Sequence, residues 1–235
     1  MMKFLDVRID LGAETGQDAR TSVQATESRL YAVRERIKET DCDAENDEFI
    51  TLLIEESNLL IELRKMGEAW SGAQQAFEMS TRNKHWRSAV RACDLMFRCE
   101  QPLSLAALGQ GIWLAVTFPV DAELTVSLLN HVIDETPDHS DGAAVAAATA
   151  VYVVDLRAKG KQYDELSVHT RQMMSTVARR HSGIENQADL DNWVQRLELN
   201  DVSRILVRLR NVVDVLVQDN WWIDRDAIQS ELPDQ

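Results

Sequence analysis

The apolar residues of this chain recur every three to four positions over most of its length, and this spacing constrains the fold more than any other feature. Glycine and proline, which interrupt helices, number only 9 and 4 among 235 residues. The pattern predicts helices over about 19–40, 84–99, 102–117, 121–135, 141–158 and 162–181, a longer apolar helix from Phe49 to Trp70, and a last helical pattern after Asn186. We therefore expect an all-α fold built from stacked antiparallel helix pairs.

The first residues follow a different pattern. Apolar side chains alternate with charged ones at Leu5, Val7, Ile9 and Leu11, as far as Gly12, which is typical of a strand with one buried face. No second run of this kind follows, and a single strand leaves its backbone groups unpaired. We expect this short N-terminal segment to pair with a second copy or a partner, or to lie as extended chain against helices.

Capping residues and glycines indicate where some predicted helices begin and end. Asp121 and Asp141 are candidate N-caps, because their short carboxylates can accept hydrogen bonds from the first free amides of a helix. Gly67 or Gly72 is expected to break the helix that starts near Phe49. The stretch 143–150 carries small side chains on every face and predicts a central helix that its neighbours approach closely.

The last helical pattern carries a wide apolar stripe. Its members step by three or four residues and are Val202, Ile205, Leu209, Val212 and Leu216. A stripe of this width must be covered, either within the chain or by a second copy. We expect these residues and the strand-like residues to be candidates for self-association as a homodimer. The predicted organisation is thus a strand-like segment and helix over 1–44, a helical-repeat-like core over 45–183, and a C-terminal capping or dimerisation helix and tail over 184–235.

Internal repetition supports the idea of stacked pairs. Pro102 and Pro137 lie 35 residues apart, and each closes a segment of two short predicted helices. On the second helix of one such pair, four residues have the spacing of the aromatic, small and packing positions of a helix-pair repeat: Trp86, Ala89, Cys93 and Met96. The next unit has Leu108-Gly109 on its first helix, and the third has a turn-like stretch at 160–165.

Residues 69–178 therefore resemble a degenerate array of about three tetratricopeptide-like units, whose usual period is about 34 residues. The resemblance implies a superhelix whose concave side, lined by the first helix of each unit, holds a peptide or protein. An irregular helical bundle is the alternative architecture.

The residue patterns of common enzymes and metal sites are absent from the sequence. There is no HExxH, no phosphate-binding loop of the Walker type, no GxSxG and no Glu-x-x-His. Cys93 and Cys99 lie on different helix faces and are interpreted as core cysteines. His139 is interpreted as a turn residue, because a metal site would need more ligands than its loop offers. We expect no catalytic residues, no metal and no cofactor, and therefore not an enzyme.

Charge and cysteine usage limit the partners and the compartment. The chain has 25 basic and 39 acidic residues, a net charge of −14, which disfavours binding to nucleic acid or anionic membranes. No run approaches the roughly 20 apolar residues that span a bilayer. Three cysteines without a CxxC and a charged N-terminus favour the reducing cytoplasm.

One basic island interrupts this acidic chain. It consists of Arg82, Lys84, Arg87, Arg91 and Arg98, opposed between 80 and 98 only by Asp94. The last three arginines are spaced to lie on one face of one helix. We expect a docking patch for an acidic segment or carboxylate of a partner. The alternative is a solvated face that pairs with neighbouring acids.

The tryptophans form two groups. Trp70, Trp86 and Trp113 lie in helical phase with apolar neighbours, which is typical of a core. Trp221 and Trp222 directly follow the apolar stripe, and two adjacent tryptophans cannot both face one core from a regular helix. At least one is therefore a candidate anchor at a partner interface. An irregular C-terminal turn that buries both is the alternative.

The interpretation that best fits these features is a non-enzymatic protein-interaction module, such as an adaptor, scaffold or chaperone-like protein that binds a peptide or protein. A second interpretation is a small-molecule-binding helical bundle or enzyme with a pocket among Trp70, Trp86 and Trp113. A third is an acidic inhibitor, such as an immunity protein, which the net charge of −14 allows.

Overall fold

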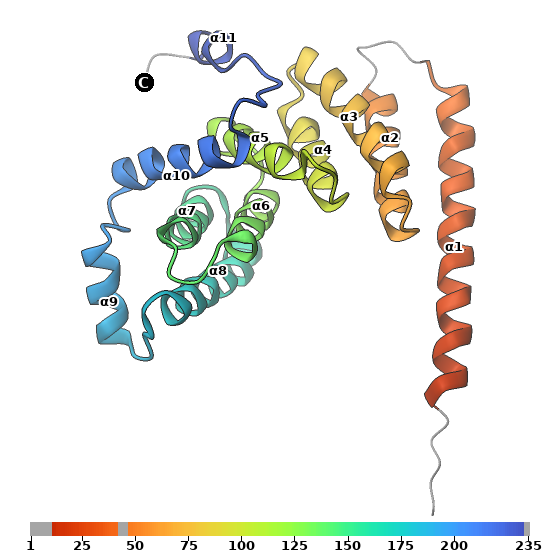
Figure 1. Cartoon of the computed structure of the whole chain (residues 1–235). Helices are drawn as coiled ribbons and strands as arrows, with labels where there is room; N and C mark the ends of the chain where they lie inside the picture. Colours follow the sequence, from red (N-terminus) through yellow and green to blue (C-terminus); the bar gives the residue numbers. More distant parts are fainter. Residues whose placement is uncertain (1–10, 42–46, 233–235) are drawn as a thin grey trace, which may run out of the picture.

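The computed structural model describes residues 11–41 and 47–232, and within these ranges the chain forms eleven α-helices and no strand (Figure 1). The helices are α1 (Leu11–Glu39), α2 (Asp47–Glu62), α3 (Met66–Arg82), α4 (Trp86–Arg98), α5 (Ser104–Thr117), α6 (Ala122–Glu135), α7 (Asp141–Arg157), α8 (Gly160–Ser182), α9 (Gln187–Arg196), α10 (Val202–Val217) and α11 (Arg225–Ser230). The predicted all-α class is confirmed. The five helices predicted between residues 84 and 181 match α4 to α8, with every end within two residues.

The N-terminal helix starts earlier than predicted. Leu11 is the first residue of α1, so the predicted strand is wrong for Leu11 and for the Gly12 that was to end it. Residues 13–20 are mostly Ala, Glu, Gln and Arg, which favour helix and extend α1 toward the N-terminus. Leu5, Val7 and Ile9 lie outside the described residues.

The break between α2 and α3 falls at Arg64 and not at a glycine. Arg64 has φ of 59°, a left-handed conformation that ends α2. Gly67 and Gly72 both lie inside α3, so the predicted break at one of them is wrong. A Cβ at residue 72 would lie 2.7 Å from Ser57 Oγ, so Gly72 allows α2 and α3 to pack closely.

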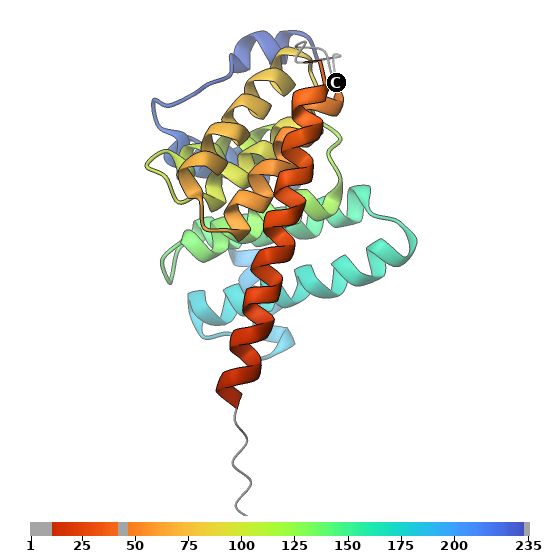
Figure 2. The same cartoon turned by 90° about the vertical axis from the view of Figure 1, so that its right-hand side faces the viewer.

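Helices α2 to α8 form a stacked array. Successive helices are joined by loops of two to five residues, and neighbours along the chain pack against each other. Alternate helices also touch on the even side, where α2 meets α4, α4 meets α6 and α6 meets α8. The second half of α1 packs along α2 through Leu30 and Val33, and its first half extends past the end of α2 (Figures 1 and 2).

The alanine-rich helix α7 lies at the centre of the C-terminal part of the array. Every residue from 143 to 150 is buried, as the small side chains predict. α7 packs against α6, α8 and α10. No helix in the described ranges is both long enough and apolar enough to span a bilayer.

One of the two predicted N-caps is correct. Asp121 caps α6, and its Oδ1 accepts a hydrogen bond from the Leu124 amide at 3.0 Å. Asp141 does not cap α7, because Ser140 occupies the cap position and accepts from the Gly142 amide at 3.2 Å. The prediction missed that Ser140, one residue earlier, is an equally good capping residue.

Arginines from later helices stabilise the ends of earlier ones. Arg157 of α7 donates to three carbonyl oxygens at and just after the end of α5, at 2.7, 3.0 and 3.3 Å. Arg180 of α8 donates to the Ile133 carbonyl of α6 at 2.8 Å, and Arg208 of α10 donates to the Leu197 carbonyl after α9 at 2.6 Å. A positive charge at a helix C-terminus is favourable, because the last carbonyls there have no partner within the helix. Sequence reasoning missed all three arginines.

The core cysteines are expected to be unreactive in the folded chain. Cys93 and Cys99 are buried and form no disulfide, and burial raises the pKa of Cys99 to about 11 and that of Cys93 well above its ordinary value. The thiolate is the reactive species, so at pH 8 iodoacetamide should label neither residue in the native chain and both in denaturant. Peptide mass spectrometry after each reaction checks this. Rapid native labelling of Cys93 would contradict it.

Candidate binding face

Helix α10 covers the side of the array formed by α5 and α7, and the segment after it contacts α3 (Figure 1). α10 lies across α5 and α7, and its fully covered residues include Ile205 and Leu209, which are 3% and 2% exposed. Val202, Val212 and Leu216 are half-buried. Ile205 and Leu209 are therefore covered within the chain and do not offer a free surface for self-association, whereas the other three stripe residues are covered only in part.

Gly109 is where α10 crosses α5. A Cβ at this position would lie 2.5 Å from Val217 Cγ2 and 3.1 Å from Leu216 Cβ. Because the glycine has no side chain, α10 packs directly on the backbone of α5. The sequence pattern placed Leu108-Gly109 at a repeat position, but its contact with α10 could not be read from the sequence.

The two adjacent tryptophans follow α10 in an irregular segment and face different helices. Trp221 packs edge-on against Trp113 of α5, with ring centroids 6.4 Å apart. Trp222 packs edge-on against two rings of α3, at 6.2 Å from Trp70 and 5.6 Å from Phe77. Both tryptophans are half-buried. Both therefore pack within the chain from an irregular segment, but neither is fully buried, as the alternative of a turn that buries both would require.

Gln110 hydrogen-bonds the backbone of this irregular segment, and the sequence pattern did not identify it as a site residue. Its side chain is fully buried in α5. Its Oε1 accepts a hydrogen bond from the Trp222 amide at 2.7 Å, and its Nε2 lies 3.5 Å from the Asn220 carbonyl and 3.4 Å from the Ala106 carbonyl. The available signal was a single polar residue within 106–115, where every other residue is apolar or glycine.

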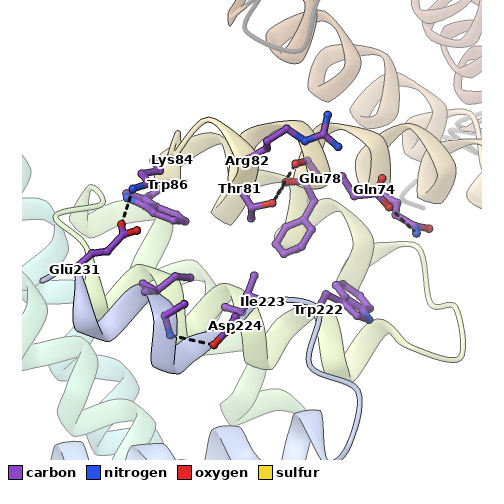
Figure 3. A pocket seen from close by; sticks show the side chains of 13 residues that line it. Gln74, Glu78, Thr81, Arg82, Lys84, Trp86, Trp222, Ile223, Asp224 and Glu231 are labelled. Carbon is purple, nitrogen blue, oxygen red and sulfur yellow. Dashed lines mark hydrogen bonds and ion pairs between the residues drawn. The ribbon is translucent and has the colours of Figure 1, made fainter.

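A groove of about 610 Å³ lies between α3 and the segment that contains α11 (Figure 3). Its lining residues are Gln74, Phe77, Glu78, Thr81, Arg82, Lys84, Trp86, Trp222, Ile223, Asp224, Ala227, Ile228 and Glu231. Trp222 lies at one end, and the ion pair between Lys84 and Glu231 lies at the other (Figure 3). The groove thus combines an apolar lining with charged groups, two of them from the predicted basic island.

The structure divides the basic island. Arg82 and Lys84 line the groove, whereas Arg87 forms an ion pair with Asp121 at the start of α6, at 3.1 Å. Arg82 is exposed and forms no ion pair with any residue that the structure describes. Figure 3 shows its side chain at the rim of the groove, directed away from the centre.

The remaining two arginines have different surroundings. Arg98 donates to Asn58 of α2 at 3.2 Å and lies 3.7 Å from Asp94. Arg91 is exposed and makes no ion pair within the described ranges. Three of the five basic residues therefore engage groups from other parts of the chain, whereas Arg82 and Arg91 make no ion pair with a described residue.

The three tryptophans of the pocket expected among Trp70, Trp86 and Trp113 make separate aromatic contacts. Trp86 stacks on Phe118 with centroids 4.1 Å apart and planes 9° apart, whereas the other two tryptophans contact the C-terminal segment. The three tryptophans come from three successive helices, α3, α4 and α5. Only Trp86 of the three lines the groove beside α11.

The two histidines nearest the loop before α7, His139 and His181, form hydrogen bonds within the chain. His139 is exposed, has φ of 65° and donates from Nδ1 to the His181 carbonyl at 2.7 Å, as a turn residue would. His181 Nδ1 accepts from the Trp193 indole at 3.2 Å, so its Nε2 donates to Asp141 at 3.1 Å. Across the described residues, no three His, Cys, Asp or Glu side chains lie where they could hold a metal ion.

Comparisons of the chain with models of known protein families, with curated proteins and with solved structures found no match. What the molecule does must therefore follow from the geometry of its own surface. In that geometry, α3 and α5 contact the chain's own residues 220–222 through their backbone and through two tryptophan rings.

Proposed function

We propose that this chain is a non-enzymatic protein-interaction module, acting as an adaptor, scaffold or chaperone-like protein. The binding site is the face of α3 and α5 together with the groove beside α11. The observation that carries the proposal is Gln110, whose buried side-chain amide hydrogen-bonds the backbone of a separate segment. Contacts to backbone suit the recognition of peptide in general, because every peptide offers the same amide and carbonyl groups.

A tetratricopeptide-like arrangement is part of this proposal. In it, α3, α5 and α7 would be the first helices of three units, and their common side would hold the ligand. The packed helix pairs from α2 to α8 support such an array without distinguishing it from an irregular bundle. We also propose a cytoplasmic location, because the buried Cys93 and Cys99 form no disulfide.

The charges beside the groove favour an acidic partner segment. Lys84 already binds a carboxylate, that of Glu231, and Arg82 at the rim carries a charge without a described acidic partner. The apolar lining, which includes Phe77 and Trp86, favours an aromatic or large aliphatic side chain in the same segment. The proposed ligand is therefore a peptide segment that carries both an aromatic residue and a carboxylate.

Peptide display against the full-length chain tests this proposal. Selected peptides are expected to share an aromatic residue with a nearby Asp or Glu. Arg82→Glu should weaken their binding by about tenfold, equivalent to about 1.4 kcal/mol, because it replaces an attractive charge with a repulsive one. Fluorescence anisotropy with the selected peptides measures this change.

Arg91→Glu is the matched control. It makes the same charge change at an exposed arginine without an ion pair to any described residue, but outside the groove. It should leave the affinity within about twofold of the wild type. Selection of no peptide, or equal affinity of the Arg82 and Arg91 variants for the selected ones, would count against the proposal.

A further inference from the structure

The chain after α10 is held less firmly than α10 itself. α10 has four buried residues, which are Ile205, Leu209, Val213 and Val217. α11 has none, and the five large apolar residues of 218–232 are all only partly buried. The two parts therefore differ in how much apolar surface would have to be re-exposed to detach them.

Gln218 separates these two parts and is strained. It ends α10 with φ of 52° and ψ of −126°, a conformation that glycine adopts readily and glutamine does not. Detachment of the following segment would release this strain. Residue 218 is therefore suited to be a hinge between the firmly packed α10 and the segment beyond it.

We propose that residues 218–232 are a displaceable intramolecular ligand, and that the face beneath them binds a partner segment of the same chemistry. That partner is a segment with two adjacent large aromatic residues, then one short helical stretch, and a carboxylate about nine residues after the second aromatic residue, as Glu231 follows Trp222 across α11. This inference rests on the proposed function and specifies the partner class and regulation of the same site.

The contacts of the segment define what a replacement must offer. Its backbone meets Gln110, its two indole rings meet aromatic rings of α5 and α3, and its carboxylate meets Lys84. None of these contacts depends on a covalent link to α10. Two further contacts lie within the C-terminal part itself, because Arg225 binds Asp214 at 2.8 Å and lies 3.9 Å from the centre of the Trp221 ring. These two contacts order the segment and are not required of a partner.

The exposed face would need a new occupant after detachment. Without the segment, the buried Gln110 would lose its partner at Trp222, and the rings of Trp113 and Phe77 would meet water. Against this, a tethered segment acts at an effective concentration of about millimolar, so it competes well with a free ligand. Weakening the contacts of the tethered segment with α3 and α5 should therefore make this face accessible to an added peptide.

The experiment adds a fluorescein-labelled synthetic peptide with the sequence of residues 218–235 to the full-length chain. Trp222→Ala in the protein weakens its own segment and leaves the side chains of α3 and α5 unchanged, so this variant should bind the peptide at least about tenfold more tightly than the wild type. Adding Gln110→Leu to that variant should remove the gain, since the face then lacks its backbone contact. A peptide with both tryptophans replaced by alanine should not bind.

Val215→Ala is the matched control variant. Val215 is an apolar residue of α10 that is 71% exposed, lies beside the loop between α6 and α7 and does not line the groove, so its replacement should not change peptide binding. Circular dichroism establishes that all variants keep their helices. Equal, weak peptide binding by the wild type and Trp222→Ala would overturn the inference.

Hydrogen exchange on the unmodified chain gives a second, independent test. Amides of 218–232, including that of Trp222, should exchange at least about tenfold faster than those of the buried side of α10, because the segment opens on its own. Exchange of both parts at one common rate would overturn the inference.

The two proposals fail differently. If neither the wild type nor Trp222→Ala selects foreign peptides, the proposed function fails. If selected peptides bind both proteins equally and are not displaced by the 218–235 peptide, the function survives and the intramolecular-ligand inference fails.

Discussion

Arg157→Ala is expected to lower the free energy of unfolding by about 3 kcal/mol, because several hydrogen bonds from one charged donor are lost together. The arginine donates to the carbonyls of Ala115, Val116 and Val120. Arg157 is half-buried, and this burial lowers the pKa of its guanidinium. Without the arginine, partly buried carbonyls at the end of α5 would remain unpaired. The chain would also lose the only residue that links the ends of α5 and α7 in this way within the described ranges.

Urea unfolding followed by circular dichroism measures the change, and the melting temperature should fall by about 6–12 °C for a chain of this size. Arg157→Lys should recover less than half of the loss, since one ammonium group cannot span three carbonyls as a guanidinium does. Arg36→Ala is the control. Arg36 pairs with Glu48 at 2.9 Å, but both side chains are more than half exposed, so its removal should cost under about 1 kcal/mol. Equal effects at positions 36 and 157 would contradict the burial argument.

Gly109→Ala and Gly67→Ala are expected to shift stability in opposite directions. Alanine at either position favours helix by up to about 1 kcal/mol. At Gly67 a Cβ meets nothing within 4 Å, so the variant should be slightly more stable than the wild type. At Gly109 the Cβ would lie 2.5 Å from Val217 Cγ2, and overpacking of this kind costs about 1–3 kcal/mol. Because the helix gain is common to both positions, we expect the two variants to differ by the overpacking cost, about 1–3 kcal/mol.

The same pair of variants tests whether α10 rests on α5 in solution. Urea unfolding of both variants gives the difference, and hydrogen exchange should show the added opening of Gly109→Ala within α10. A gain in stability at both positions would mean that α10 does not lie against residue 109.

For the basic island, the sequence predicted the position of the arginines on a helix but not their partners. The spacing of Arg87, Arg91 and Arg98 correctly places them on one helix, because that spacing depends only on the local turn of the chain. Their partners come from elsewhere: Asp121 binds the first and Asn58 the last. Nothing local distinguishes Arg91, which has no described ion pair, from its two neighbours.

The sequence alone determined that the chain is all-α and where most helices lie. The signals for a helix and its ends, which are apolar periodicity, glycine and proline positions and capping residues, are local in the sequence. The ends of α4 to α8 could therefore be predicted to within two residues. The break at Arg64 and the cap at Ser140 were missed, because several nearby residues could serve equally well and packing chose among them.

Only the tertiary structure decided which surfaces remain available. Gln110 and Trp222 lie 112 residues apart, and Arg157 lies about 40 residues from the carbonyls it binds. Contacts over such separations depend on how whole helices stack, which hydrophobic spacing within one helix does not specify. For the same reason, the sequence predicted that the apolar stripe of α10 must be covered, but it did not show that the backbone of α5 at Gly109 packs against the end of α10.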